Sequence, residues 1–248
     1  MKRKELELSQ QLSFHLAEQV ISPTVIVSPR RKTVALEIKQ GVVRLRVPSK
    51  VSVQWLADFI EQRKSWIAKH LKRQQEALDQ FLPDPFEKQR CHFLGDEYPV
   101  VWDKTSSKSH VVFDTNKLSV YLSLRSKKTP NHLVNEQMRI WLQQQAADYL
   151  VKRTHELSFL VGKRPSTVVI SNHKTMWGRC SVKGEIALNW RLMLADREAI
   201  DYVIIHELCH LYEFNHSAAF WQRVAQYCSN AKQFKEYFKQ RASWLHWR

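Results

Sequence analysis

The residues best suited to chemistry form the run His206-Glu207-Leu208-Cys209-His210, which has the pattern H-E-x-x-H. Four residues are a little over one helical turn, so in a helix both imidazoles project from one face and could bind a single metal ion. Glu207 would lie about a quarter turn from His206, outside the ligand row but close enough to reach a water on that metal. The pattern therefore predicts a metal site with a carboxylate beside it.

A third ligand is expected because catalytic zinc usually has three protein ligands and leaves one position for water. His216, six residues beyond His210, is the candidate, and the full pattern is H-E-x-x-H-x-x-x-x-x-H. His216 can reach the same ion only if the helix ends before it, and Asn215, which tolerates left-handed backbone, is the expected stopping residue. The sequence thus predicts Zn²⁺ on His206, His210 and His216, with Glu207 activating zinc-bound water for attack on a carbonyl.

Two supporting features can be proposed from the sequence. The oxyanion that develops in such a reaction needs a donor besides zinc, and Tyr202, Tyr212 and Arg179 are candidate oxyanion or substrate contacts that the sequence does not rank. A strand predicted over residues 185–190 precedes the metal helix, in the order that zincins use for an edge strand. That strand could hold a peptide by strand addition.

Several stretches around these residues resemble one protein family. They are residues 176–181 (MWGRCS), 186–192 (IALNWRL), 201–211 (DYVIIHELCHL), 215–217 (NHS) and 220–221 (FW). Together they resemble the YgjP-like metallopeptidase domain family, which is similar to the SprT-like and WLM zinc peptidases. Further upstream, residues 28–36 (SPRRKTVAL), 47–49 (VPS) and 66–67 (WI) resemble the basic N-terminal region of that family. The resemblance covers most of residues 23–225.

The resemblance implies a zincin-like domain that hydrolyses polypeptides. It implies His206, His210 and His216 as zinc ligands and Glu207 as the catalytic base. Arg179 departs from the pattern, because the family is expected to have a small residue between the glycine and the cysteine of this block.

The strands and helices predicted around these residues indicate an α+β fold. Residues 1–129 are expected to form a strand-rich, basic N-terminal half with one long helix, and residues 130–248 a mostly helical, minimal zincin-like domain with a small sheet. The boundary is placed at residues 126–130 (SKKTP), where polar residues and proline interrupt both periodicities. Strands are predicted at 24–27, 34–38, 42–47, 92–102, 111–124, 167–171 and 185–190, and helices at 53–79, 131–160 and 232–244, with two more capped by Asp196 and Ser217.

The chain carries a strong positive charge: its 248 residues include 39 Lys+Arg and 24 Asp+Glu, for a formal net charge of +15. Residues 30–73 hold twelve of the basic residues and three acidic ones, so this segment has a net charge of +9. Such a segment either binds polyanions or is a solvated face that keeps the protein soluble. The candidate polyanion contacts are Arg30, Arg31, Lys32, Arg44, Arg46 and Lys50.

Composition also excludes some functions. The five glycines cannot form G-x-G-x-x-G or a Walker-type loop, so nucleotide chemistry on a glycine-rich loop is excluded. No apolar run follows the basic start, and no stretch approaches the ~18 apolar residues of a membrane helix, so neither a secretory signal nor a membrane partner is expected. The four cysteines form no C-x-x-C pair, which favours reduced thiols and a cytoplasmic location.

A zinc peptidase is the favoured function, and two alternatives remain open. One is a metal-dependent hydrolase of a non-peptide bond such as a nucleotide phosphoanhydride, whose phosphates the basic segment could hold. The other is a nucleic-acid-associated protein that docks through residues 30–73. It could use its zinc site in an ancillary role, or cleave proteins lodged on DNA, as the similarity to SprT-like peptidases suggests.

Overall fold

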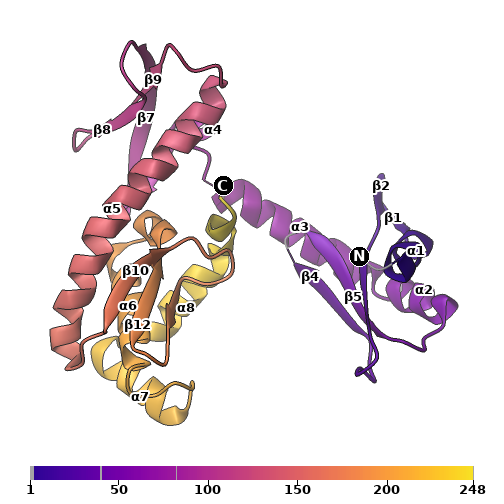
Figure 1. Cartoon of the computed structure of the whole chain (residues 1–248). Coiled ribbons are helices and arrows are strands. Elements are labelled where there is room, and N and C mark those ends of the chain that lie inside the picture. Colours follow the sequence, from indigo (N-terminus) through magenta and orange to yellow (C-terminus); the bar gives the residue numbers. More distant parts are fainter. Residues whose placement is uncertain (1–2, 40, 82, 248) are drawn as a thin grey trace. The chain divides into compact units, whose positions relative to one another are not determined.

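A computed structural model describes residues 3–39, 41–81 and 83–247 as two compact units, Met1–Gln80 (unit 1) and Phe81–Arg248 (unit 2). Figure 1 shows unit 1 in indigo and purple and unit 2 in magenta to yellow. Strands concentrate in the N-terminal half of the chain and helices in the C-terminal half, which confirms the predicted α+β class.

Unit 1 is built on a three-stranded sheet with the order β3-β5-β4. Its elements are α1 (Arg3–Gln11), β1 (Phe14–Leu16), β2 (Gln19–Ile21), β3 (Thr24–Ser28), β4 (Ala35–Lys39), β5 (Val42–Pro48), α2 (Val53–Glu61) and α3 (Lys64–Phe81). Val43, Leu45 and Val47 alternate along β5 and are buried, because successive side chains of a strand point to opposite faces. They form a core with residues of α2 and α3 such as Leu56 and Ile67.

The candidate polyanion contacts of unit 1 lie on the opposite face of this sheet or in its loops, whereas other basic residues of the unit, such as Lys69, lie on its helices. Arg44 and Arg46 alternate with the buried residues of β5 and are partly exposed. Glu37 of β4 lies opposite Arg44 in the strand register and forms a 3.1 Å ion pair with Arg46, so one carboxylate offsets part of this charge. Of the other candidate contacts, Arg30, Lys32 and Lys50 are exposed and Arg31 is half-buried.

The predicted helix over residues 53–79 is two helices, α2 and α3, because the chain breaks at Gln62 and Arg63. Ser52 caps α2 as expected, accepting a hydrogen bond from the backbone N–H of Trp55 at 3.4 Å.

Unit 2 contains two small sheets beside the long helix α5 (Figure 1). Its elements are α4 (Pro85–Lys88), β6 (Arg90–Phe93), β7 (Asp96–Thr105), β8 (His110–Phe113), β9 (Leu118–Ser123), α5 (Pro130–Val161), β10 (Thr167–Ser171), β11 (Gly178–Cys180), β12 (Glu185–Asn189), the 3-10 helix η1 (Trp190–Leu194), α6 (Arg197–Cys209), α7 (Ala218–Tyr227), α8 (Ala231–Gln240) and the 3-10 helix η2 (Ala242–His246).

The strands before α5 belong to the same core as the helices after it. The two strands predicted at 92–102 and 111–124 are four, β6 to β9, in a sheet of order β6-β7-β9-β8. Phe93 of β6 packs 4.8 Å, centroid to centroid, from Trp141 of α5, and Val120 of β9 joins the same buried cluster as Ile204 of α6. The boundary expected between residues 129 and 130 therefore lies inside unit 2, because this shared core spans it; the division between the compact units falls between Gln80 and Phe81.

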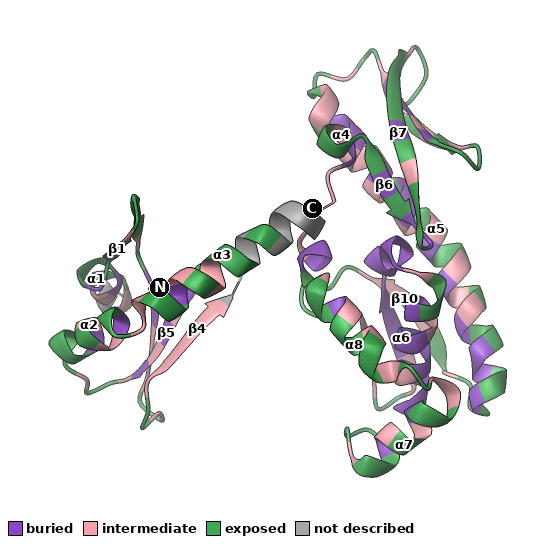
Figure 2. Ribbon diagram, turned by 180° about the vertical axis from the view of Figure 1, so that it is seen from behind, coloured by how far each residue is buried: buried purple, intermediate pink, exposed green. Residues whose placement is uncertain are grey.

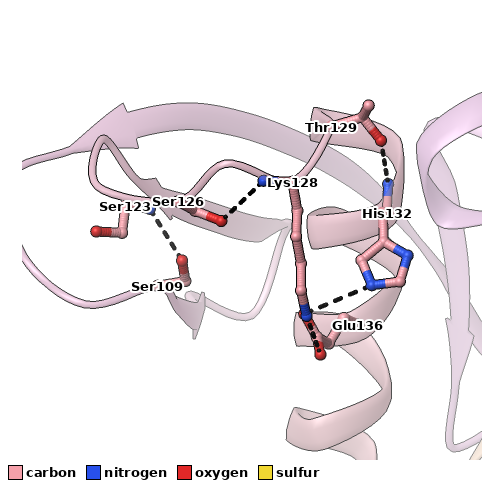
Figure 3. Close-up of polar contacts among 7 residues, drawn as sticks. All are labelled: Ser109, Ser123, Ser126, Lys128, Thr129, His132 and Glu136. Atoms are coloured by element: carbon pink, nitrogen blue, oxygen red, sulfur yellow. Dashed lines mark hydrogen bonds and ion pairs between the residues drawn. The ribbon is translucent and has the colours of Figure 1, made fainter.

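Local hydrogen bonds fix the start of α5, as Figure 3 shows. The Thr129 hydroxyl accepts from the backbone N–H of His132 at 3.4 Å, and Pro130 occupies the first turn, where it has no N–H to satisfy. Lys128 lies 2.8 Å from the Glu136 carboxylate and so fastens the preceding loop to the helix. The helix ends at Val161, and its C-cap is Gly162, whose φ of 80° is a conformation that favours glycine.

The second sheet of unit 2 supports α6. Its strand order is β10-β12-β11, with β10 parallel and β11 antiparallel to the central strand β12. Helix α6 packs on this sheet and on α5, and it is among the most buried elements of the chain (Figure 2). Strand β11 is not predicted by the sequence, because three residues are too few to show an alternating pattern.

Candidate metal centre

Helix α6 carries the H-E-x-x-H run and is held rigidly. Ile200, Ile204 and Leu208 recur at helical spacing and are fully buried, as the amphipathic pattern requires. Arg153 of α5 forms two hydrogen bonds of 2.8 and 2.7 Å with the Asp201 carboxylate, so a bidentate ion pair also joins the two helices. The candidate metal ligands of the next turn therefore have little freedom to move.

Three imidazoles converge at the C-terminal end of α6. One ring nitrogen from each of His206, His210 and His216 lies within 4.8 Å of the others. The Nε2 atoms of His206 and His216 are 3.1 Å apart. Within the described parts of the chain, this is the one group of three His, Cys, Asp or Glu residues close enough to share a metal ion.

His216 reaches the other two histidines because α6 stops early. The helix ends at Cys209 with His210 as its C-cap, so the expected stop at Asn215 is wrong by several residues. Asn215 instead accepts a hydrogen bond from the backbone N–H of Ser217 at 3.2 Å. Ser217 caps α7 as predicted, accepting from the N–H of Phe220 at 3.2 Å.

Neighbouring groups orient the imidazoles. The Nδ1 atom of His210 lies 2.9 Å from the backbone carbonyl of Glu213, and the proton it donates there leaves Nε2 free as a ligand. The buried ring of Phe220 stacks on His210 at a centroid distance of 4.4 Å, and Trp221 stacks on His216 at 5.7 Å. These contacts fix the rings where a metal ion would need them.

Burial favours the neutral form of His206 and His210, which is the form that binds metal. Burial, followed by the charges of His210, His216 and Lys235, lowers the pKa of His206 to about 3. Burial also lowers the pKa of His210, although its hydrogen bond to Glu213 opposes this shift. Three converging imidazoles, with the tautomer of His210 set by its contact with Glu213, are a donor set that fits zinc and would leave the fourth of its usual positions for water.

Glu207 lies beside the histidines and is 5 % exposed. Burial raises the pKa of its carboxyl group to about 8, and a hydrogen bond from the backbone N–H of Cys180 opposes this rise. Gly178 also faces it: a β-carbon there would be 2.5 Å from the Glu207 Oε1 atom. The sequence did not predict this role of Gly178. The presence of a glycine next to Trp177 in the 176–181 block could have indicated a close approach of the backbone to another group.

The three candidate oxyanion residues lie in different surroundings. Tyr202 is buried, its ring centroid is 6.0 Å from that of His206, and it lines a cavity with His206 and Glu207. The Tyr212 hydroxyl instead donates to the backbone carbonyl of Val161 at 3.2 Å. Arg179 is exposed in β11, and strand alternation directs its side chain away from the face on which Gly178 meets Glu207. The structure therefore brings only Tyr202 of the three to the wall shared with His206 and Glu207.

The strand expected to hold a peptide at a sheet edge has no free edge. β12 pairs with β10 through residues such as Ile186 with Val168, and with β11 through Ala187 with Arg179. The expectation of strand addition to residues 185–190 is thus wrong, because both hydrogen-bonding edges of the strand are already occupied. β11, which runs past Glu207, lies at the edge of this sheet.

None of the helices in the described residues is both long and apolar enough to cross a lipid bilayer.

Comparisons with known proteins give one structural and one family relationship. The chain is similar to the protein in the "Crystal structure of the metallopeptidase zymogen of Pyrococcus abyssi abylysin", with 26% identity, a TM-score of 0.33, and coverage of 36% of this chain and 90% of that one. No curated protein matches the chain significantly. The family model described as "YgjP-like, metallopeptidase domain" matches residues 32–241, most of the chain and the whole H-E-x-x-H-x5-H pattern. That match confirms the resemblance seen in the sequence, and the chain belongs to the YgjP-like metallopeptidase domain family.

Proposed function

We propose that this protein is a zinc-dependent peptidase in which Glu207 transfers the protons of hydrolysis. The observation that carries the proposal is the convergence of His206, His210 and His216 beside a single buried carboxylate. The family to which the chain belongs supports a metallopeptidase.

The three histidines would bind the zinc ion. His206, His210 and His216 would hold the ion through three ring nitrogens, and the hydrogen bond from His210 to Glu213 would keep its ligand nitrogen deprotonated. Zinc in such a site supplies a Lewis acid that lowers the pKa of water and polarises a carbonyl.

Glu207 would hold the transferred proton on its carboxylate. Burial makes the protonated form of this side chain easier to reach, and the Cys180 N–H keeps the ionised form accessible. A carboxylate balanced in this way can accept a proton from the attacking water and deliver it to the leaving amine. Gly178 permits the close approach of β11 that presents the Cys180 N–H.

Tyr202 would donate a hydrogen bond to the developing oxyanion. Burial, with smaller effects from Cys228 and Glu207, raises the pKa of its hydroxyl, so this group stays protonated and able to donate. Its position on the cavity wall with His206 and Glu207 favours it over Tyr212 and Arg179.

The experiment that tests the proposal compares the purified wild type with Glu207→Gln. Both proteins are assayed for zinc content and for hydrolysis of denatured protein, nucleoside triphosphates and protein–DNA adducts. We expect both to bind one zinc ion, and only the wild type to cleave protein. Retained cleavage by Glu207→Gln would exclude the proposed proton transfer.

The same screen separates the two alternative functions. Hydrolysis of nucleoside triphosphates with no cleavage of protein would identify a phosphoanhydride hydrolase. Cleavage that requires DNA would point to docking through unit 1, and it should then weaken in Arg44→Glu, since Arg44 lies on the basic sheet face.

A further inference from the structure

A cavity of about 460 Å³ opens beside His206 and Glu207, within unit 2. This volume lies in the range of about 300–1,000 Å³ that is typical of small-ligand sites. The cavity adjoins the candidate metal centre, because His206 and Glu207 are among its lining residues; His210 and His216 are not.

Part of the cavity wall is apolar. Trp177 and Phe238 pack against each other at a centroid distance of 4.8 Å, and Val203 and Leu245 complete this surface. Phe238, Val203 and Leu245 are each 5 % exposed, so the wall is part of the fixed core. A surface of this kind favours a large apolar or aromatic side chain.

An exposed lysine, Lys235, is among the residues that line the same cavity. Lys235 of α8 lines it, and its ammonium lies 5.3 Å from the ring centroid of Trp221, which is itself 5.8 Å from the ring of His206. Among the described residues, no carboxylate lies within ion-pair distance of Lys235. The other lysine of the cavity, Lys239, already pairs with Glu236 at 3.1 Å. Lys235 is therefore the charge that could attract an anionic group of a ligand.

The position of Glu207 indicates which side of the scissile bond the cavity serves. If Glu207 delivers a proton to the leaving amine, that amine must come within hydrogen-bond reach of its carboxylate. Glu207 lies on the cavity wall. The residue that contributes the leaving amine would therefore place its side chain in this cavity.

We propose that the cavity binds the residue after the scissile bond, that this residue has a large apolar side chain, and that Lys235 binds a nearby substrate carboxylate. The proposal rests on the proposed peptidase function. The carboxylate has two possible sources: the C-terminus of the substrate, or an acidic side chain of the next residue. Both present the same group to Lys235, and experiment can separate them.

The test measures binding by calorimetry to zinc-loaded Glu207→Gln, so that no probe is consumed. The probes are N-acetylated Ala-Ala-Phe with a free C-terminus, its C-terminal amide, the amide of Ala-Ala-Phe-Glu, and Ala-Ala-Ala with a free C-terminus. We expect at least one of the two carboxylate probes to bind at least about tenfold more tightly than the Ala-Ala-Phe amide. These two probes are Ala-Ala-Phe with a free C-terminus and the amide of Ala-Ala-Phe-Glu. Tighter binding of the free acid assigns the carboxylate to the C-terminus, and tighter binding of the glutamate peptide assigns it to the next residue.

Three variants built on Glu207→Gln locate the binding. Lys235→Gln should remove the preference for the carboxylate, whereas Lys232→Gln, an exposed lysine on the same helix that does not line the cavity, should keep it. Ala242→Trp places a large group in the cavity from an exposed position and should weaken every phenylalanine probe by about tenfold or more. The proposal is overturned if the amide binds as tightly as both carboxylate probes, if Ala-Ala-Ala binds as tightly as Ala-Ala-Phe, or if Lys235→Gln and Lys232→Gln behave alike.

Cleavage by the wild type tests the subsite assignment and the peptidase function separately. Products sequenced by mass spectrometry should begin with phenylalanine or another large apolar residue. If peptides bind as expected and none is cleaved, the cavity is a peptide-binding site, and the peptidase function fails together with the assignment to the residue after the scissile bond. If protein is cleaved with no preference for such residues, the peptidase function stands and the subsite assignment fails.

Discussion

Gly178 and Glu207 are in such close contact that any side chain at position 178 would require the Glu207 side chain to shift. A β-carbon there would lie 2.5 Å from Oε1, 2.7 Å from Cγ and 2.8 Å from Cδ of Glu207, all below normal contact distances. Glu207 is buried, so this contact restricts where its carboxylate lies within the site. The backbone of β11 thus sets the position of the carboxylate that the proposed mechanism uses.

Replacing Gly178 by alanine should therefore displace Glu207 and leave His206, His210 and His216 in place. We expect kcat for protein cleavage to fall about 100-fold, the cost of misplacing a catalytic group by about 1 Å. Zinc content, measured by atomic emission, should stay at the wild-type level. Val182→Ala, at an exposed position close by in the same segment, should keep full activity. Wild-type kcat in Gly178→Ala would show that the contact has no role in positioning Glu207.

Zinc should stabilise the folded protein through the three histidines. A ligand that binds only the folded state at 100 times its Kd adds about 2.7 kcal/mol to the free energy of unfolding. We expect Tm to rise when zinc is added to protein treated with a chelator, and not to rise in His210→Ala. His155→Ala is the matched control, because His155 also precedes a glutamate on a helix but is exposed and lies outside the triad. An equal gain in Tm for His210→Ala and the wild type would contradict the proposed ligand set.

The bidentate pair between Arg153 and Asp201 should contribute measurably to stability. Asp201→Asn keeps the size of the side chain and removes its charge, and we expect it to lower the free energy of unfolding by about 1–2 kcal/mol. Asp148→Asn, at an exposed position on α5, should change stability by less than about 0.5 kcal/mol. Urea unfolding measures both values. If the two variants lose the same amount, the pair contributes no more than a surface charge.

Cys91 should make the protein less stable at alkaline pH. Burial, and to a smaller extent the charge of Glu97, raises the pKa of its thiol from 9.0 to about 12. Between these values the unfolded chain loses a proton that the folded chain keeps, so the free energy of unfolding falls as pH rises above about 9. Below pH 9 the thiol is protonated in both states and has no effect.

Removal of this thiol provides the comparison. In Cys91→Ala the fall in stability above pH 9 should be shallower than in the wild type, by up to about 1.4 kcal/mol per pH unit. Urea unfolding of chelator-treated protein from pH 8 to 10.5 measures the difference. Parallel curves for the two proteins would show that Cys91 does not contribute to the pH dependence.

Much of the local structure was predictable because it depends on residues that are close in sequence. The spacing of Ile200, Ile204 and Leu208 predicted the buried stripe of α6, and alternation predicted that Val43 and Leu45 face the core. Three-residue strands such as β11 are too short to show a period, and the break between α2 and α3 has no proline or glycine to mark it.

The sequence by itself determined the chemistry of the candidate centre: two imidazoles on one helical face, a carboxylate beside them, and membership of a metallopeptidase family. Only the tertiary structure decided what surrounds these residues. The early end of α6 brings His216 to the other histidines, β11 sets Glu207 in place, and α8 adds Lys235 to a cavity at the same site. The physical reason is that helical spacing is a local property of the chain, whereas these contacts join separate elements through packing that no local pattern specifies.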